Sequence, residues 1–135
     1  MKTIFAFLLM LMPLMPVFAQ NDEVIFGDPE RMPEYPGGQK ALFAFLGENT
    51  HYPKESEKNK EEGRAIVKFI IDKDGTVTDV EIARSSGYEL LDKEAVRVVS
   101  SMPKWKPGSI SGEFVRVQFT LPLNFRLNTP APKAE

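Results

Sequence analysis

The sequence predicts a small α+β domain in which two helices pack on one face of a three-stranded antiparallel sheet. Three observations favour this class. Two segments rich in Val, Ile and Phe flank a short turn, and a helical stripe of apolar residues follows them. A long strand near the C-terminus then alternates apolar and polar side chains. The order is helix, hairpin, helix and strand, without an internal repeat, which fits a single domain.

The first predicted helix covers residues 39–46. It follows the turn signal Pro36-Gly37-Gly38 and places its apolar residues on one face, and we expect it to end at Gly47. Tyr52-Pro53 is a second break in the chain. Residues 54–62 are almost wholly charged, so they predict a short solvated helix or turn.

A β-hairpin is predicted from residues 64–72 and 76–84. Asp72-Lys73-Asp74-Gly75 lies between the two strands, and glycine adopts the positive φ that a tight hairpin turn requires. Asp72 and Asp74 could be an acid pair or a fragment of a calcium site, but the loop lacks the further oxygen ligands that calcium needs. Both aspartates are explained as turn formers.

A second helix is expected from residue 89 to residue 102. Ser85-Ser86-Gly87 precedes it, and Pro103 ends it. Trp105 follows in an irregular link, and we expect its ring to close the end of the core while the neighbouring lysines extend around it. Stacking of Trp105 on a ligand is the alternative.

The last predicted strand, residues 114–126, has the clearest pattern in the chain. Its odd-numbered residues from Val115 to Phe125 are apolar and are expected to face the core. A slip of one residue would bury Arg116 and Gln118, so the pattern specifies the register strongly. Pro122 indicates a strand at an edge of the sheet or at a bulge.

Residues 1–19 indicate an export signal. Lys2 precedes an apolar run over residues 4–18, and Ala19 ends a small-residue cleavage site before Gln20. The run is shorter than the roughly 20 residues that a membrane helix needs. Cleavage would leave 135 − 19 = 116 residues, and an uncleaved signal anchor is the alternative.

The predicted division of the chain has four parts. A signal peptide at residues 1–19 is followed by a short leader at residues 20–34, which would span about 50 Å at full extension. The folded domain covers residues 35–127. Residues 128–135 are rich in Pro and Ala and predict a disordered tail.

Composition excludes several classes of function. The formal net charge is −2, and removing Lys2 makes it 16 − 19 = −3, which argues against nucleic acid and anionic membranes as partners. The chain has no cysteine and one histidine, so we expect no metal centre and no cofactor. Ser85 and Ser86 have no base within reach along the sequence, so we expect no enzymatic activity.

The motifs together resemble the C-terminal domain of TonB, the energy transducer between the inner membrane and outer-membrane transporters, in the version found in Bacteroidetes-type bacteria. The resemblance covers about Pro33 to Leu127. Each motif is weak alone, whereas their order and spacing are highly specific. The motifs are Tyr35-Pro36-Gly37-Gly38, Tyr52-Pro53, Gly63 before the first hairpin strand, Asp72-Lys73-Asp74-Gly75, Ser85-Ser86-Gly87, Leu91-Asp92-Lys93-Glu94-Ala95, Met102-Pro103-Lys104-Trp105-Lys106-Pro107-Gly108 and Leu121-Pro122-Leu123-Asn124-Phe125.

The resemblance implies binding by strand addition, in which the domain takes the TonB box of an outer-membrane transporter onto the edge of its sheet. The edge is the last strand, about Phe114 to Phe125. The expected partner contacts are Asn49, Thr50, His51 and Tyr52 before the second break, and Arg116, Gln118 and Thr120 on the last strand. For His51 the alternative is an exposed loop histidine, and for Arg116 and Gln118 it is an ordinary solvent-facing side chain.

The sequence departs from a full transducer of this family at its N-terminus. The family carries a membrane helix and a long Pro-rich spacer, whereas this chain has a cleavable signal and a short leader. We therefore expect a periplasmic binding module that contacts the membrane only if the signal stays uncleaved. The alternative is a periplasmic scaffold that forms homodimers through its exposed strand edges, without energy transduction.

Overall fold

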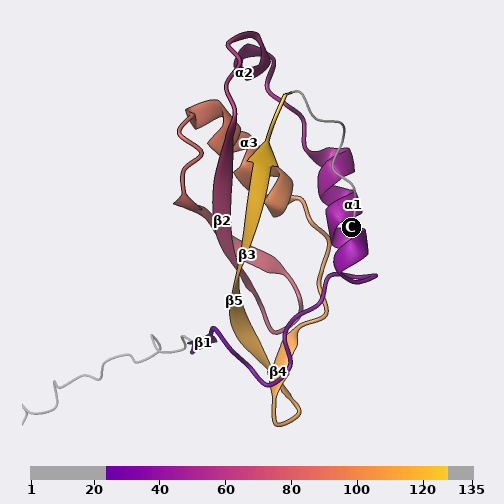
Figure 1. Ribbon diagram of the computed structural model, residues 1–135. Helices are drawn as coiled ribbons and strands as arrows, with labels where there is room; N and C mark the ends of the chain where they lie inside the picture. The colour runs from indigo at the N-terminus through magenta and orange to yellow at the C-terminus, as the bar shows by residue number, and fades with distance from the viewer. Residues whose placement is uncertain (1–23, 128–135) are drawn as a thin grey trace, which may run out of the picture.

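The α+β class is confirmed by the structure, a computed structural model that describes residues 24–127 (Figure 1). The predicted signal peptide and the predicted tail lie outside the described residues. Among the described residues, no helix is long and apolar enough to cross a membrane. The elements in chain order are β1 (Ile25–Phe26), α1 (Gln39–Asn49), α2 (Lys54–Lys58), β2 (Gly63–Ile71), β3 (Val77–Arg84), α3 (Glu89–Ser100), β4 (Gly108–Ile110) and β5 (Glu113–Phe125).

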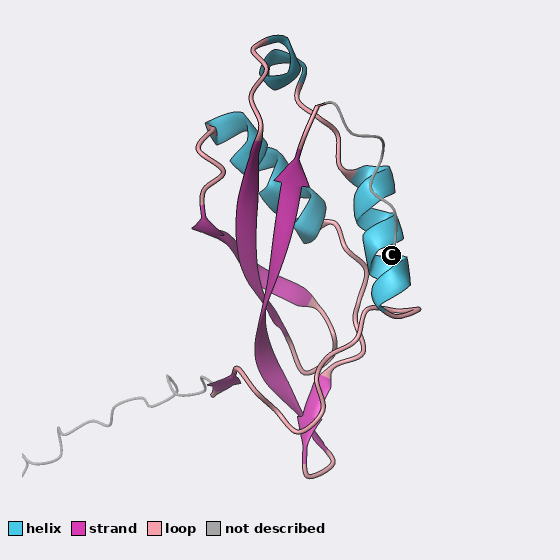
Figure 2. Ribbon diagram, viewed as in Figure 1, coloured by secondary structure: helices cyan, strands magenta, loops and turns pink. Residues whose placement is uncertain are grey.

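The three predicted strands form the centre of the sheet, and two short strands extend it (Figure 2). The strand order is β1-β5-β2-β3, and β4 pairs separately with the start of β5. β2 and β5 are antiparallel in an unbroken register from Gly63 opposite Phe125 to Ile71 opposite Val117. The sheet is mixed because β1 runs parallel to β5.

One face of the sheet carries the core, as the alternation in the sequence predicts. The inward side chains of β2 and β5 pack with the apolar faces of α1 and α3. Burial of this face accounts for the strict register of β5, since a shift by one residue would exchange its apolar and polar sides. The buried residues of these four elements are Ala65, Val67, Phe69, Ile71, Leu121, Leu123, Phe125, Leu42, Leu46, Leu91, Ala95, Val98 and Val99.

Trp105 closes one end of this core, which confirms the prediction from the sequence. Its side chain is 4% exposed. The ring lies edge-on to Tyr35 at 5.6 Å and packs against Phe119 at 5.2 Å and Phe69 at 5.8 Å between ring centroids.

The turn between β2 and β3 is built against the same tryptophan. Asp74 Oδ1 accepts a hydrogen bond from the Thr76 amide at 3.0 Å, so this aspartate is a turn former. Gly75 has a φ of +91°, and a Cβ there would lie 2.0 Å from the carbonyl oxygen of Trp105. Glycine is required here both for its conformation and for the close approach of the Trp105 backbone.

The expectation that the first helix ends at Gly47 is wrong, because α1 continues to Asn49. One local contact and one long-range contact hold the end of the helix instead of a glycine. Asn49 Nδ2 donates a hydrogen bond to the Phe45 carbonyl oxygen at 2.8 Å, and Arg97 Nη2 donates one to the Asn49 carbonyl oxygen at 2.7 Å. The bond from Arg97 satisfies a carbonyl group that the end of the helix leaves unpaired.

Residues 54–62 are less solvated than predicted. α2 is the short helix that the sequence suggests, but Ser56 within it is 0% exposed. One face of α2 therefore packs on the domain, and the small serine fits there while its charged neighbours remain exposed. The expectation of a wholly solvated segment is wrong at Ser56.

The second half of the leader is paired with the domain. Arg31 exchanges two backbone hydrogen bonds of 3.0 Å with Ser109, and Glu34 exchanges two of 2.9 and 2.8 Å with Lys106. At Gly108 a Cβ would lie 2.8 Å from the Arg31 carbonyl oxygen, so the absence of a side chain permits this approach. Residues 30–34 are consequently integrated into the fold.

Candidate partner-binding edge

The central sheet has two outer strands with unpaired sides, β3 and most of β5. β5 pairs with β2 on one side along residues 117–125. On its other side, β1 contacts only Arg116 and Val117. Within residues 24–127, no strand pairs with the outer side of residues 118–125, which we call the β5 edge.

The edge of β3 is irregular. Two register shifts interrupt its pairing with β2, one between Ile66 and Val67 and one between Lys68 and Ile70. At the second shift, Asp79 takes a φ of +51°. Bulges of this kind twist an edge and disturb the row of backbone groups that an added strand requires. The regular β5 edge is therefore the better acceptor of a strand.

Pro122 indicates how the backbone of the β5 edge is directed. It pairs with Ile66 without a break in register, although proline has no N–H to donate. Proline is tolerated in a regular ladder when its nitrogen faces away from the neighbouring strand. Backbone groups alternate along a strand, so those of Gln118, Thr120 and Asn124 face the free side together with Pro122.

The three predicted partner residues on β5 divide into two kinds. Gln118 and Thr120 are exposed on the β5 edge. Arg116 lies beside β1 instead, and its side chain is 20% exposed. Its Nε lies 3.6 Å from Asp72 Oδ1, and its Nη2 lies 3.6 Å from Asp79 Oδ2. The two carboxylates hold Arg116 over the outer face of the sheet.

The predicted segment Asn49–Tyr52 is held by α3. The amide of His51 donates a hydrogen bond to Glu94 Oε2 at 2.7 Å. Thr50 follows the end of α1, and its amide donates to the Leu46 carbonyl oxygen at 3.0 Å. The imidazole of His51 is exposed, whereas the backbone around it is fixed.

Glu94 and Arg97 form the ion pair that anchors this segment. Arg97 Nε and Nη2 donate to the two oxygens of Glu94 at 2.8 and 2.7 Å, and Nη2 also reaches the Asn49 carbonyl. Burial by itself raises the pKa of Glu94, but the hydrogen bonds from Arg97 and from the His51 amide outweigh it. The pKa of Glu94 therefore lies below its ordinary value of 4.5.

The two groups of predicted residues lie at opposite ends of β5. Tyr52 packs edge-on against Phe125, with ring centroids 5.7 Å apart, and its hydroxyl donates to the Glu61 carbonyl oxygen. Arg116 lies at the start of the strand, about 30 Å from Phe125 at the rise of an extended chain. The structure does not bring the two groups into one cluster.

Ser85 and Ser86 have an acidic neighbour that was not expected. Ser85 Oγ donates to Asp92 Oδ2 at 2.5 Å, and the hydroxyl and amide of Ser86 donate to Oδ1 at 2.7 and 2.8 Å. The absence of a nearby base was therefore a wrong expectation, because the first turn of α3 folds back onto the serines. Asp92 accepts all of these bonds and thereby fixes the turn before α3.

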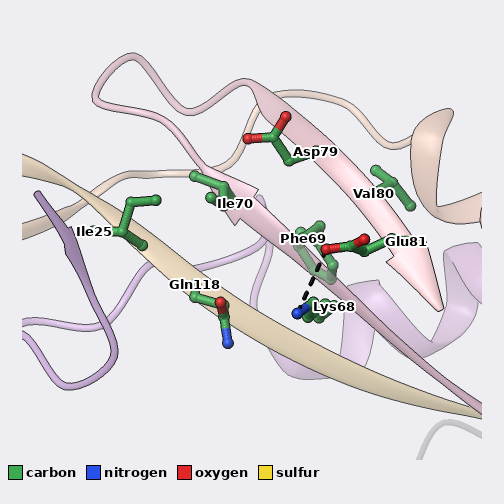
Figure 3. A pocket seen from close by; sticks show the side chains of 8 residues that line it. All are labelled: Ile25, Lys68, Phe69, Ile70, Asp79, Val80, Glu81 and Gln118. Atoms are coloured by element: carbon green, nitrogen blue, oxygen red, sulfur yellow. Dashed lines mark ion pairs between the residues drawn. The ribbon is translucent and has the colours of Figure 1, made fainter. Parts of the chain in front are cut away.

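Concave surfaces lie beside the sheet and beside α3. An apolar groove of about 760 Å³ lies along α3, beside residues 51–53. A second cavity, of about 380 Å³, lies on the outer face of the sheet between β1, β2, β3 and β5 (Figure 3). Lys68 and Glu81 form an ion pair of 3.5 Å across it. Among the described residues, no group of three or more His, Cys, Asp or Glu side chains could hold a metal ion.

The fold is that of a small α+β domain whose sheet has a free, regular edge strand. Comparison with known proteins agrees with this class, since residues 48–127 match the family described as Gram-negative bacterial TonB protein C-terminal. The chain belongs to the TonB C-terminal domain family. The family is non-enzymatic. The hydrogen bonds that Asp92 accepts from Ser85 and Ser86 hold the turn before α3.

Individual relatives are distant. The chain is 27% identical over 109 residues to Protein TonB of Haemophilus influenzae, and the match covers 76% of this chain and 39% of that protein. The NMR structure of the Helicobacter pylori TonB C-terminal domain is similar with a TM-score of 0.51 and 24% identity, over 67% of this chain and 94% of that one. The NMR structure of the Pseudomonas aeruginosa domain has a TM-score of 0.50 and 25% identity, over 60% and 81%.

Proposed function

We propose that this chain is a periplasmic TonB-type binding module that adds an extended segment of an outer-membrane TonB-dependent transporter to its β5 edge. In this role it contributes to energy-coupled transport. The support comes from the family match over residues 48–127 and from the geometry of the sheet.

The regularity of the β5 edge is the observation that carries the proposal. Residues 118–125 provide an unbulged row of backbone groups, backed by a fully paired β2. Strand addition draws its affinity from such main-chain hydrogen bonds. The exposed side chains of Gln118 and Thr120 then lie beside the added segment, and Tyr52 lies at the end of the row.

The location of the module follows from the proposed division of the chain. The signal at residues 1–19 exports it, and the motifs match the Bacteroidetes-type version of the family. Since residues 30–34 are paired with the domain, only the residues before β1 and the turn after it remain as leader. A chain cleaved after Ala19 would then work as a free periplasmic module.

A proline substitution on the β5 edge tests this function. Thr120→Pro removes one N–H from the free side and leaves the ladder between β2 and β5 complete, because the Thr120 amide faces away from β2. We expect the variant to bind N-terminal segments of the transporters at least about 10-fold more weakly, a loss of about 1.4 kcal/mol. Calorimetry with these segments measures the change.

Thr120→Ala is the matched control, because it changes the side chain and keeps the amide. Unchanged binding by Thr120→Pro, in a variant whose thermal unfolding shows an intact fold, would contradict strand addition at this edge. Concentration-dependent dimerisation in sedimentation without binding of any transporter segment would instead support the self-associating scaffold.

A further inference from the structure

β1 occupies the start of the edge that the proposed function assigns to the partner. Ile25 pairs with Arg116 and Phe26 with Val117, both in the parallel direction, so Phe26 also lies beside the backbone of Gln118, and the fully free part of the β5 edge begins at Phe119. We propose that β1 is an internal occupant of the partner-binding edge and that an incoming partner strand displaces it. This inference rests on the proposed function and concerns how that edge is regulated.

An added strand and β1 compete for space. A segment paired with residues 118–125 belongs to a longer chain, and it can extend its pairing past Gln118 only toward Arg116. Phe26 already lies at this position, opposite Val117. Since two strands cannot pair with the same side of one strand, the partner has to remove β1 to extend its pairing.

β1 is held weakly, while the residues after it are held firmly. It contributes two paired residues, and Val24 and Ile25 are 68% and 44% exposed. By contrast, Arg31 exchanges two backbone hydrogen bonds of 3.0 Å with Ser109. Short, exposed segments open at low free-energy cost. β1 can therefore leave its position while Arg31 keeps it tethered nearby, at a high effective concentration.

The neighbours of β1 indicate which segment would replace it. Ile25 and Ile70 both line the cavity on the outer face of the sheet, beside Gln118 (Figure 3). Ile70 is buried although it lies on the outer face. The position of Ile25 thus favours an apolar side chain, and β-branched residues also favour the extended conformation. The partner segment is accordingly an extended peptide with an apolar residue at this position.

A pair of proline variants tests the displacement. In the parallel ladder with β5, the amide of Phe26 faces β5 while that of Ile25 faces solvent, because the backbone of Arg116 and Gln118 faces β1. Phe26→Pro should therefore release β1, and Ile25→Pro should leave it paired. The probe is a synthetic peptide of residues 23–29, Glu-Val-Ile-Phe-Gly-Asp-Pro, added to the purified chain.

We expect Phe26→Pro to bind this peptide at least about 10-fold more tightly than the unmodified chain or Ile25→Pro, because an occupied edge reduces the apparent affinity by its free fraction. Fluorescence anisotropy of the labelled peptide measures this. Equal affinity for all three chains, or no binding by Phe26→Pro, would overturn the inference.

A disulfide lock provides the opposite test. The chain has no cysteine, and Ile25 and Arg116 are direct partners, so Ile25→Cys with Arg116→Cys can fix β1 in place. Oxidation should abolish peptide binding and reduction should restore it, whereas the single variant Ile25→Cys should bind the peptide equally under both conditions. Equal binding of transporter segments in the locked and reduced forms, with sensitivity to Thr120→Pro, would retain the proposed function and overturn the role of β1.

Discussion

Glu94 and Arg97 connect α3 to the segment that follows α1. Both reach main-chain atoms, the amide of His51 and the carbonyl of Asn49, rather than the side chains of that segment. The position of the segment therefore depends on residues more than 40 positions away in the sequence. Glu94 and Arg97 form an ordinary i,i+3 pair on the solvent side of a predicted helix, so their second role has no signal in the sequence.

The depressed pKa of Glu94 predicts a pH dependence of stability. A carboxyl whose pKa is lower in the folded state stabilises the fold above its unfolded pKa, and this contribution disappears as the pH falls through the folded pKa. We expect Glu94→Gln to be less stable than the unmodified chain at pH 7, and the difference to shrink below about pH 4.5. Urea unfolding at several pH values measures it.

Glu89→Gln, at an exposed position of the same helix, is the control for a general effect of charge. A difference between Glu94→Gln and the unmodified chain that stays constant from pH 7 to pH 3 would show that the ion pair is not the cause.

We expect truncation of Trp105 to cause the largest loss of stability for a single side chain. Its ring contacts Tyr35, Phe69 and Phe119 in the closed end of the core. Trp105→Ala should lower the free energy of unfolding by about 3–5 kcal/mol, because the lost ring leaves a cavity. Trp105→Phe should lose less. A loss below about 1 kcal/mol in denaturant unfolding would show that the ring contributes little to the core.

At the scale of the elements, the sequence predicted the helices and strands that depend on residues close together in the chain. The alternation over residues 114–126 and the turn at Asp72–Gly75 set β5 and the hairpin, and both are confirmed. β1 and β4 were not predicted, because two- and three-residue strands carry no periodicity of their own. Their pairing depends on partners far along the chain. The bulges of β3 likewise depend on tertiary pairing, since no glycine marks them.

A substitution at Gly108 tests how firmly residues 30–34 are attached to the domain. In Gly108→Ala the new Cβ would lie 2.8 Å from the Arg31 carbonyl oxygen and 2.9 Å from Val117 Cγ2, so the backbone of residues 30–34 must move. We expect a loss of about 1–3 kcal/mol in unfolding free energy and faster amide exchange at Ser109.

Gly27→Ala is the matched control for this change, because a Cβ there has no atom within 4 Å. Slow exchange at Ser109 in Gly108→Ala would mean that the paired leader tolerates the added methyl group.

At the scale of the whole molecule, the two outer strands differ in their capacity to pair. Sequence patterns predicted an exposed last strand but not that β1 would cover its first residues, since that requires the leader to fold back. The location of the candidate site therefore stays a prediction, and the pairing of β1 beside it had no signal in the sequence. Along β5, the part paired with β1 comes first and residues 118–125 follow. The Tyr52 ring lies at the far end, against Phe125.

The irregular edge of β3 has a consequence for stoichiometry. Growth of a sheet from one molecule to the next needs two receptive sides per molecule, one to accept and one to offer. The shifts at Val67 and Ile70 leave β3 a poor template, so under the proposed function β5 is the strand of residues 24–127 that receives the partner. Complexes formed through this sheet should consequently stop at one added strand for each chain, and the protein terminates an assembly rather than propagating a polymer.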